Sequence, residues 1–232
     1  MKVGTKSLLF GVHCFFIHPL WVALAWWKLY GFPLDPRLWV AFIAHDWGYW
    51  GSPEMDGPTG DLHPYVGAKI MHWLFDGWEY RDTSDFSYSL ELQTEGWSIC
   101  GVSEDHQILS LCRRNPQWYD FCVNHSRFLA KQCGMQPSRL CMADKLSLGL
   151  EPWWLYLPRA WASGELKEYM RSAQPDGKHG HMNLQQVTAK QWYQSVQQYL
   201  RQYVAEHKDG KIDIVTQINT DRFKSGKNGV WL

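Results

Sequence analysis

Residues 18–48, HPLWVALAWWKLYGFPLDPRLWVAFIAHDWG, contain two apolar helical segments that decide the fold. Apolar residues four, seven and eleven positions after His18 form one stripe of a helix that begins at His18–Pro19. Asp35–Pro36 is an N-cap and first-turn pair, and it opens a second helix that runs through His45–Asp46 and is ended by Gly48. The sequence therefore predicts two helices, each with a potential metal ligand at or near one end.

The start of the chain also raises the question of a membrane segment. Residues 8–27 form a run of twenty residues without formal charge, about the length that a membrane-spanning helix needs. Pro19 interrupts this run, and a proline inside a helix removes a backbone hydrogen bond. Lys2 and Lys6 resemble the start of a secretory signal, but the small-residue cleavage pattern is missing. We therefore expect a buried helix of a globular protein.

The composition narrows the choice of partners. Lys plus Arg equals Asp plus Glu at 23 each among the 232 residues, so no net charge would attract nucleic acid or an anionic membrane. Six cysteines without C-x-x-C spacing favour reduced thiols and a cytoplasmic protein. We expect no nucleic-acid partner and no membrane partner. The sequence leaves the oligomeric state open, with a homodimer as one alternative.

The rest of the chain predicts further helices around one long interruption. Residues 76–115 combine short alternating apolar pieces with glycines and polar residues, which indicates an inserted loop or hairpin region. We expect an all-α helical bundle over residues 1–160 that contains this insertion. Residues 161–232 are expected to form a C-terminal helical extension and tail packed on the same domain. The further helices are predicted at residues 64–75, 116–134, 137–152 and 183–207.

Six residues with metal-ligand chemistry lie within apolar helical segments or at their ends. A buried polar side chain is costly unless it is paired or bound to metal, and helical bundles build metal sites from inward histidines and carboxylates. A single histidine on an apolar face is more often an ordinary core residue. The joint occurrence of all six, including one adjacent His–Asp pair, favours a metal centre. These candidates are His18, His45, Asp46, His63, His125 and Asp144.

The other histidines are not expected to bind metal. His13 precedes His18 by five positions, which is about 140° around a helix, so the two rings would face different directions. His72 and His106 are expected to be ordinary structural residues. The remaining three are predicted in a polar loop or at an exposed helix end, namely His179, His181 and His207.

The ordered pattern H…HD…H…H…D on consecutive helices resembles the HD-domain superfamily of metal-dependent phosphohydrolases. The segments LHPYVGAKI, VNHSRFLA and LCMADKLSLGLEP are similar to those of its bacterial dinuclear branch, which hydrolyses diadenosine tetraphosphate. The resemblance covers residues 12–75 and 116–152. Three residues after Asp46, where the family often has a lysine, this chain has Tyr49.

The resemblance implies an HD-type bundle with two divalent transition-metal ions, such as Fe, Mn or Zn. His18, His45 and Asp144 would complete the site of one ion, His63 and His125 that of the other, and Asp46 would bridge them. The catalytic residues would be Asp46, His63 and His125. Two adjacent cations polarise a phosphoryl oxygen and lower the pKa of a bridging water. The implied reaction is hydrolysis, by a metal-bridging hydroxide, of a phosphoester or phosphoanhydride in a nucleotide or another small phosphorylated molecule.

Four basic residues near the ligand candidates are expected to bind the substrate. Arg127 and Lys131 come shortly after His125. They are four residues apart, which places them on one helical face. Arg139 and Lys145 flank Asp144 in sequence. Cationic side chains form strong hydrogen bonds with phosphate, so one or two of the four are predicted to hold a non-reacting phosphate.

Two alternatives use the same ligand set. Some members of the superfamily are diiron oxygenases that cleave a C–C or C–P bond with dioxygen. Such an enzyme should require air and iron, whereas a hydrolase should turn over without air and with more than one divalent metal. The other alternative is a non-catalytic nucleotide-binding protein, in which the Gln-rich C-terminal helix would contact a partner.

Overall fold

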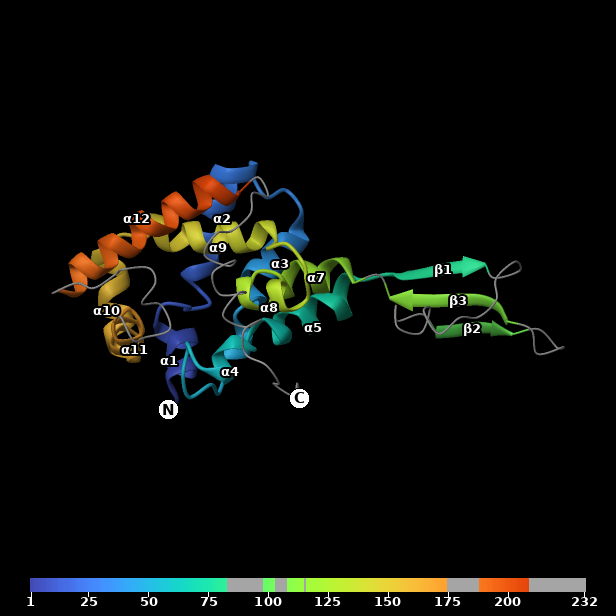
Figure 1. Ribbon diagram of the computed structural model, residues 1–232, viewed down its shortest axis with the longest axis horizontal. Coiled ribbons are helices and arrows are strands. Elements are labelled where there is room, and N and C mark those ends of the chain that lie inside the picture. The colour runs from blue at the N-terminus through green and yellow to red at the C-terminus, as the bar shows by residue number, and fades with distance from the viewer. Residues whose placement is uncertain (83–97, 103–107, 115, 175–187, 209–232) are drawn as a thin grey trace, which may run out of the picture.

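A computed structural model of the 232-residue chain describes residues 1–82, 98–102, 108–114, 116–174 and 188–208. These residues form a helical body and a three-stranded sheet that extends away from it (Figure 1). The elements of the body are α1 (Val3–Phe10), α2 (His18–Tyr30), α3 (Pro36–Ala44), the 3-10 helix η1 (Trp47–Tyr49), α4 (Pro58–Asp61), α5 (Pro64–Phe75), α7 (Gln117–Val123), α8 (Arg127–Gln132), α9 (Arg139–Leu150), α10 (Trp153–Ser163), α11 (Glu165–Ser172) and α12 (Ala189–His207).

The two helices at the centre of the sequence pattern begin where predicted, but the second, α3, ends at Ala44 and not at the predicted Gly48. Pro19 lies in the first turn of α2, where its missing N–H breaks no helical hydrogen bond, and Gly31 follows the end of the helix. The Asp35 side chain caps α3 by accepting a hydrogen bond from the Arg37 backbone N–H. The uncharged run 8–27 is interrupted, because α1 ends within it at Phe10 and the non-helical residues 11–17 separate α1 from α2. Among the described helices, none has both the length and the apolar character needed to cross a bilayer.

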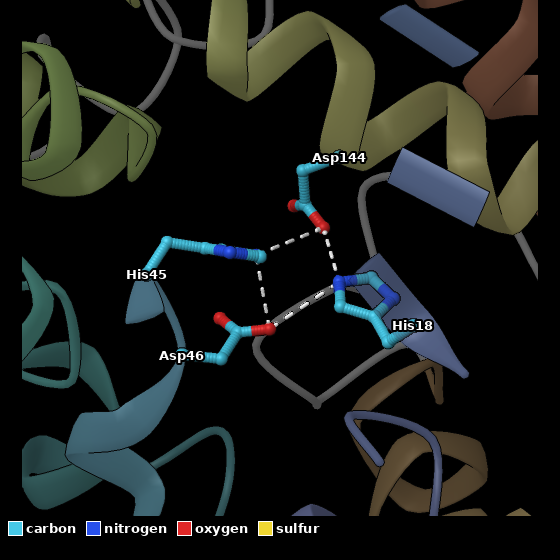
Figure 2. A group of neighbouring side chains, drawn as sticks. All are labelled: His18, His45, Asp46 and Asp144. Atoms are coloured by element: carbon cyan, nitrogen blue, oxygen red, sulfur yellow. Dashed lines mark ion pairs between the residues drawn. The ribbon is translucent and has the colours of Figure 1, made fainter. Parts of the chain in front are cut away.

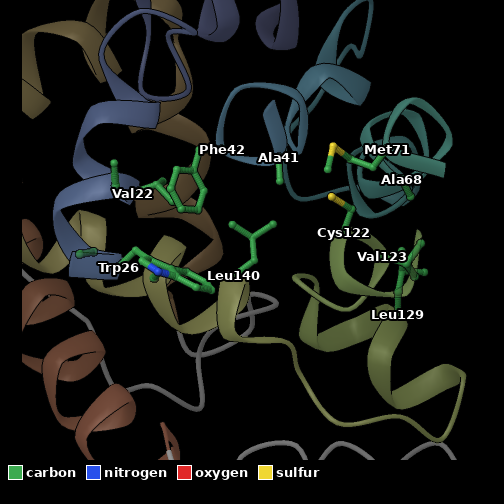
Figure 3. Packing of buried hydrophobic residues seen from close by; sticks show 13 residues of the cluster. Val22, Trp26, Ala41, Phe42, Ala68, Met71, Cys122, Val123, Leu129 and Leu140 are labelled. Carbon is green, nitrogen blue, oxygen red and sulfur yellow. The ribbon is translucent and has the colours of Figure 1, made fainter. Parts of the chain in front are cut away.

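The main hydrophobic core lies where α2, α3, α5, α7 and α9 meet (Figure 3). α2 packs along α9, and α5 packs along α7. The side chains of Val22, Phe42, Met71, Cys122 and Leu140 are completely buried. Because these residues come from all five helices, burying them fixes the helices relative to one another and gives the body a rigid interior.

The C-terminal helix α12 packs on α9 and caps its end. The Tyr193 hydroxyl shares its single proton between the backbone oxygens of Leu148 (2.9 Å) and Glu151 (3.0 Å). Gln197 Nε2 donates to the same Glu151 oxygen at 2.7 Å, and Arg201 donates to the backbone of α9 one residue after Leu148. The last carbonyls of a helix have no partner within it, so polar residues spaced by four on α12 satisfy those of α9.

The predicted insertion contains a sheet. Its strands are β1 (Trp78–Asp82), β2 (Ser98–Val102) and β3 (Ile108–Arg114), and they pair antiparallel in the order β1-β3-β2. Trp78 pairs with Arg114, so the two ends of the insertion lie side by side. The prediction of a helical fold holds for the body, and the sheet is an addition to it. The alternating residues Phe86, Tyr88 and Leu90 lie outside the described residues.

The predicted continuous helix over residues 116–134 is wrong. α7 ends at Val123, residues 124–126 form a turn, and α8 begins at Arg127. The Ser126 side chain accepts a hydrogen bond from the Leu129 N–H at 3.3 Å and so caps the start of α8. For the predicted helix 183–207, the structure describes α12 from Ala189 on, and residues 183–187 lie outside the described part.

Candidate metal centre

Six His and Asp side chains from five segments meet inside the helical body. His18 is the first residue of α2, and the adjacent His45 and Asp46 follow the end of α3. His63 precedes α5, His125 lies in the turn between α7 and α8, and Asp144 is in the middle of α9. His125 therefore lies in the turn that interrupts the predicted helix 116–134.

Three of the histidines are oriented by the same local contact. Nδ1 of His45, His63 and His125 lies 3.0, 2.6 and 2.6 Å, respectively, from the backbone oxygen three residues earlier. A carbonyl oxygen only accepts hydrogen bonds, so Nδ1 carries the proton in each ring. In the neutral ring, Nε2 therefore carries the lone pair, which is the form of histidine that binds metal.

Four residues form the first group, which Figure 2 shows. His18 Nε2 lies 3.3 Å from Asp46 Oδ2 and 3.1 Å from Asp144 Oδ1. His45 Nε2 lies 3.1 Å from the same Asp46 oxygen and 3.9 Å from the same Asp144 oxygen. Two imidazole nitrogens and two carboxylate oxygens thus face one point, from α2, α9 and the end of α3.

The second group contains Asp46, His63 and His125. Asp46 Oδ1 lies 3.4 Å from His63 Nε2 and 3.7 Å from His125 Nε2. Asp46 therefore directs one carboxylate oxygen toward each group. The two Nε2 atoms are only 3.0 Å apart. Because each ring has its proton on Nδ1, the lone pairs of the two Nε2 atoms repel each other, and a cation bound by both would remove this repulsion.

Glycines allow the segments that carry these ligands to approach closely. A side chain at Gly48 would overlap the backbone of His63, and one at Gly67 would press on Ala44 and His45. η1 and the end of α3 therefore pack directly against α5. This contact brings His63 next to Asp46, although the two residues belong to different elements.

The ligand atoms fit a metal ion better than they fit one another. His18 Nε2, His45 Nε2 and Asp46 Oδ2 are buried and have no hydrogen bond among the described residues, although they lie within ion-pair distance. Buried polar atoms that lack hydrogen bonds are costly, and a bound cation would satisfy all three. Imidazole and carboxylate together suit first-row transition metals. The described residues thus contain two adjacent His/Asp groups that can hold metal ions.

The electrostatics differ between the two groups. Burial lowers the pKa of His45, but the charge of Asp46 and the contact with Asp144 outweigh burial and raise it to about 10. The pKa of His18 is also raised, because the two carboxylates outweigh burial. In the second group, burial and the nearby His125 lower the pKa of His63 to about 4. The first group is therefore an environment that favours positive charge, and the second keeps its imidazoles neutral.

The predicted substrate-binding cations lie at different distances from the centre. Lys145 Nζ lies 2.8 Å from Asp144 Oδ2. Burial lowers the pKa of Lys145, but the Asp144 carboxylate outweighs burial and raises it. Arg127 is close enough to Lys145 to oppose that rise, and its guanidinium lies 4.7 Å from the centroid of the Tyr203 ring. Arg139 is exposed and stacks on Tyr30, and Lys131 lies on α8. Lys145 and Arg127 are thus the pair associated with the ligand cluster.

His13, which the sequence reasoning set aside, contacts the centre. Its ring centroid lies 5.5 Å from that of His18 and 4.9 Å from that of Tyr49. The helical-angle argument fails because residues 11–17 are not helical. Tyr49, three residues after Asp46, is buried and stacks on His63 with centroids 4.0 Å apart. No helical periodicity in the sequence points to His13. The only signal for it was its closeness in sequence to His18, five residues later.

The remaining histidines have structural contacts or are not described. His72 pairs with Asp76 at 2.7 Å, as expected for a residue outside the metal groups. His207 was predicted to be exposed, but it is buried, stacks on Tyr203 and donates from Nδ1 to the Tyr203 backbone oxygen at 2.7 Å. His106, His179 and His181 lie outside the described residues.

Comparisons with protein-family models, with curated proteins and with solved structures found no match for the chain. A functional assignment therefore depends on the geometry of the two groups and on the order of their residues in the sequence. The feature that limits the choice most is Asp46, because it belongs to both groups.

Proposed function

We propose that the chain is an HD-type metal-dependent phosphohydrolase. Its substrate would be a nucleotide or another small phosphorylated molecule, cleaved at a phosphoester or phosphoanhydride bond. One observation carries the proposal: Asp46 places one oxygen in each of two buried His/Asp groups. A carboxylate in this position suits a dinuclear centre, and the order of the six residues along the chain matches the HD pattern.

Each residue of the centre has a role in this proposal. His18, His45, Asp46 and Asp144 would hold one divalent ion, and Asp46, His63 and His125 the other. Two such ions, when bound, supply Lewis-acid activation of water and polarise a phosphoryl oxygen. The backbone contacts at Nδ1 of His45, His63 and His125 keep the three rings in the binding tautomer.

The cations next to the centre would hold the phosphate groups. Lys145 is a direct neighbour of the ligand Asp144, and Arg127 lies close to Lys145. We propose that these two residues bind a phosphate group that does not react, because their donors are charged and fixed by packing against Asp144 and Tyr203. Lys131 and Arg139 would contact more distant parts of the substrate.

The experiment that tests the proposal measures metal and turnover together. The purified chain is analysed by elemental mass spectrometry, and phosphate release from a panel of nucleotides and phosphate esters is followed under air and under argon. We expect about two equivalents of a transition metal and hydrolysis under both atmospheres. Activity only with iron and dioxygen would identify an oxygenase. Metal-free protein, or metal without turnover, would support a non-catalytic binding protein.

A further inference from the structure

The outward side of α10 is apolar over its whole length. The helix packs on α1, α11 and α12 through its other side, where Tyr156 and Ala160 are buried. Its exposed residues occupy about 180° of the helix circumference, and none of them is charged. They are Trp153, Trp154, Pro158, Trp161 and Ala162. Trp154 and Trp161 are 62% and 76% exposed, and a continuous apolar surface of this kind marks a contact with a partner or a membrane.

Arg159 is the one charged residue within α10, and it is turned toward the interior. One of its guanidinium nitrogens donates to the backbone oxygen of Gly11 at 2.8 Å, and another pairs with the buried Glu151. The Arg159 side chain is only 11% exposed. A single exposed tryptophan on a protein surface is ordinary. A helix that pairs its charge inside and presents three tryptophans to solvent requires a specific explanation.

The helices that pack on α10 carry basic side chains near it. Those that are exposed or half-buried on α1, on α11 and in the first turn of α12 are Lys6, Lys167, Arg171 and Lys190. Lys190 Nζ lies 4.4 Å from the centroid of the Trp153 ring, so this cation borders the exposed face of α10 directly. Lys167 and Arg171 are four residues apart and share one side of α11, which follows α10 after a single residue.

The acidic residues of α11 are paired with donors of the protein. Glu165 is completely buried, and Glu168 accepts hydrogen bonds from the backbone N–H groups of Met55 and Asp56, both at 2.8 Å. α1 and α10 contain no acidic residue, and α12 contains none before Glu206 in its last turn. The charges that these described helices present to solvent near α10 are therefore mainly positive, although the whole chain has equal numbers of acidic and basic residues.

We propose that α10 docks the protein on an anionic membrane surface, with Trp153, Trp154 and Trp161 at the level of the lipid headgroups. Tryptophan favours this layer because its ring is apolar and its N–H is polar. The neighbouring cations attract anionic lipids over about 10 Å, so local charge decides the attraction and the net charge of the chain does not. α10 and α11 lie at the end of the helical body away from the sheet (Figure 1), so the sheet leaves this surface accessible.

A second copy of the chain fits this surface less well than a membrane does. A symmetric dimer brings the same patch of both copies into contact, so Lys190 and the neighbouring cations would face their own counterparts. Three tryptophans of about 150–250 Å² each, already partly buried, also supply less than the roughly 800 Å² per partner of a standard interface. An anionic lipid surface has the opposite charge and accepts apolar side chains without a matching shape.

Co-sedimentation of the purified full chain with lipid vesicles tests the inference. One set of vesicles contains equal parts of phosphatidylcholine and phosphatidylglycerol, and the other contains phosphatidylcholine alone. Binding to the anionic vesicles should be about a hundredfold tighter, because each cation near such a surface contributes about fivefold. Added salt should weaken this binding. The measurement does not involve the metal centre, so its result is independent of the proposed function.

A matched pair of tryptophan variants tests whether α10 is the surface that binds. Trp161→Gln should weaken binding to the anionic vesicles by about tenfold, because it removes a large apolar side chain from the contact. The control is Trp73→Gln on α5, where the side chain is 73% exposed, and this change should leave the binding as it is. Lys190→Ala should weaken the binding by about fivefold. Circular dichroism verifies that each variant keeps its helices.

The inference would be wrong if the wild type bound neither kind of vesicle or bound both equally. It would also be wrong if Trp73→Gln lost as much affinity as Trp161→Gln, or if Trp161→Gln and Lys190→Ala both kept full affinity. Analytical ultracentrifugation without lipid examines the other occupant. A wild-type dimer that Trp161→Gln dissociates would assign this face of α10 to a second copy of the chain and overturn the membrane contact.

Discussion

Asp46 is the residue on which both groups depend, since its two oxygens point to different sets of imidazoles. Asp46→Ala should therefore remove both ions and reduce the metal content from about two equivalents to nearly none. His125→Ala should remove only the ion of the second group and leave about one equivalent. Elemental mass spectrometry after gel filtration measures both values, with circular dichroism to verify the helical content.

A matched control for these variants is His72→Ala. His72 is a partly buried histidine that pairs with Asp76 and belongs to neither group, so its loss should leave both equivalents in place. If His72→Ala lost as much metal as Asp46→Ala, the metal would depend on overall packing. If Asp46→Ala kept one full equivalent, the carboxylate would not be shared.

Proton release is a second prediction at the scale of single residues. The pKa of His45 is about 10 before metal binds, so its ring is protonated at neutral pH and must lose that proton to become a ligand. Metal affinity should consequently rise with pH, by about tenfold per pH unit for each proton released. Calorimetry in two buffers with different ionisation enthalpies counts the protons. Affinity that stays constant from about pH 6 to 8 would be inconsistent with a protonated first group.

At the scale of elements, the structure explains the polar face of α12. Its residues Tyr193, Gln197 and Arg201 bond to the carbonyls at the end of α9, which carries Asp144. The other glutamines of α12 are exposed, so the alternative in which this Gln-rich helix contacts a partner stays a prediction. The C-terminal helix therefore stabilises the helix that presents a candidate ligand.

Tyr193→Phe tests the capping role of α12. Removing the hydroxyl leaves the backbone oxygens of Leu148 and Glu151 with fewer donors and should lower the free energy of unfolding by about 1 kcal/mol. The control is Tyr199→Phe, because the Tyr199 hydroxyl is buried and has no hydrogen bond among the described residues. That change should be neutral or slightly stabilising. Urea unfolding measures both, and equal effects of the two variants would rule out the capping role.

The sequence predicted the start of α2 and α3 correctly because proline and N-cap residues act within one helical turn. It failed over residues 116–134, where apolar residues resume directly after the short polar turn that separates α7 from α8. Ser126 was a visible cap signal at the true start of α8. The turn exists because α7 and α8 each pack on the body, which periodicity within one segment does not express.

At the scale of the whole molecule, the sheet of the insertion extends away from the helices (Figure 1). Its first and last residues, Trp78 and Arg114, are paired, and α5 and α7 on either side pack on each other. Replacing residues 78–114 by a short Gly/Ser turn should therefore leave the helical content and the metal content unchanged. Circular dichroism and elemental mass spectrometry check this, and loss of metal would mean that the insertion supports the centre.

The sequence by itself determined the helical segments around the centre and the order of six ligand-type residues. Both are local properties, because helix periodicity and capping act over a few residues. Only the tertiary structure decided that Asp46 faces two groups and that Lys145 lies beside them. It also joined His13 to Glu165, which is 152 residues away in sequence. Such pairs form when helices bury their apolar faces against one another, and no spacing within one segment contains that information.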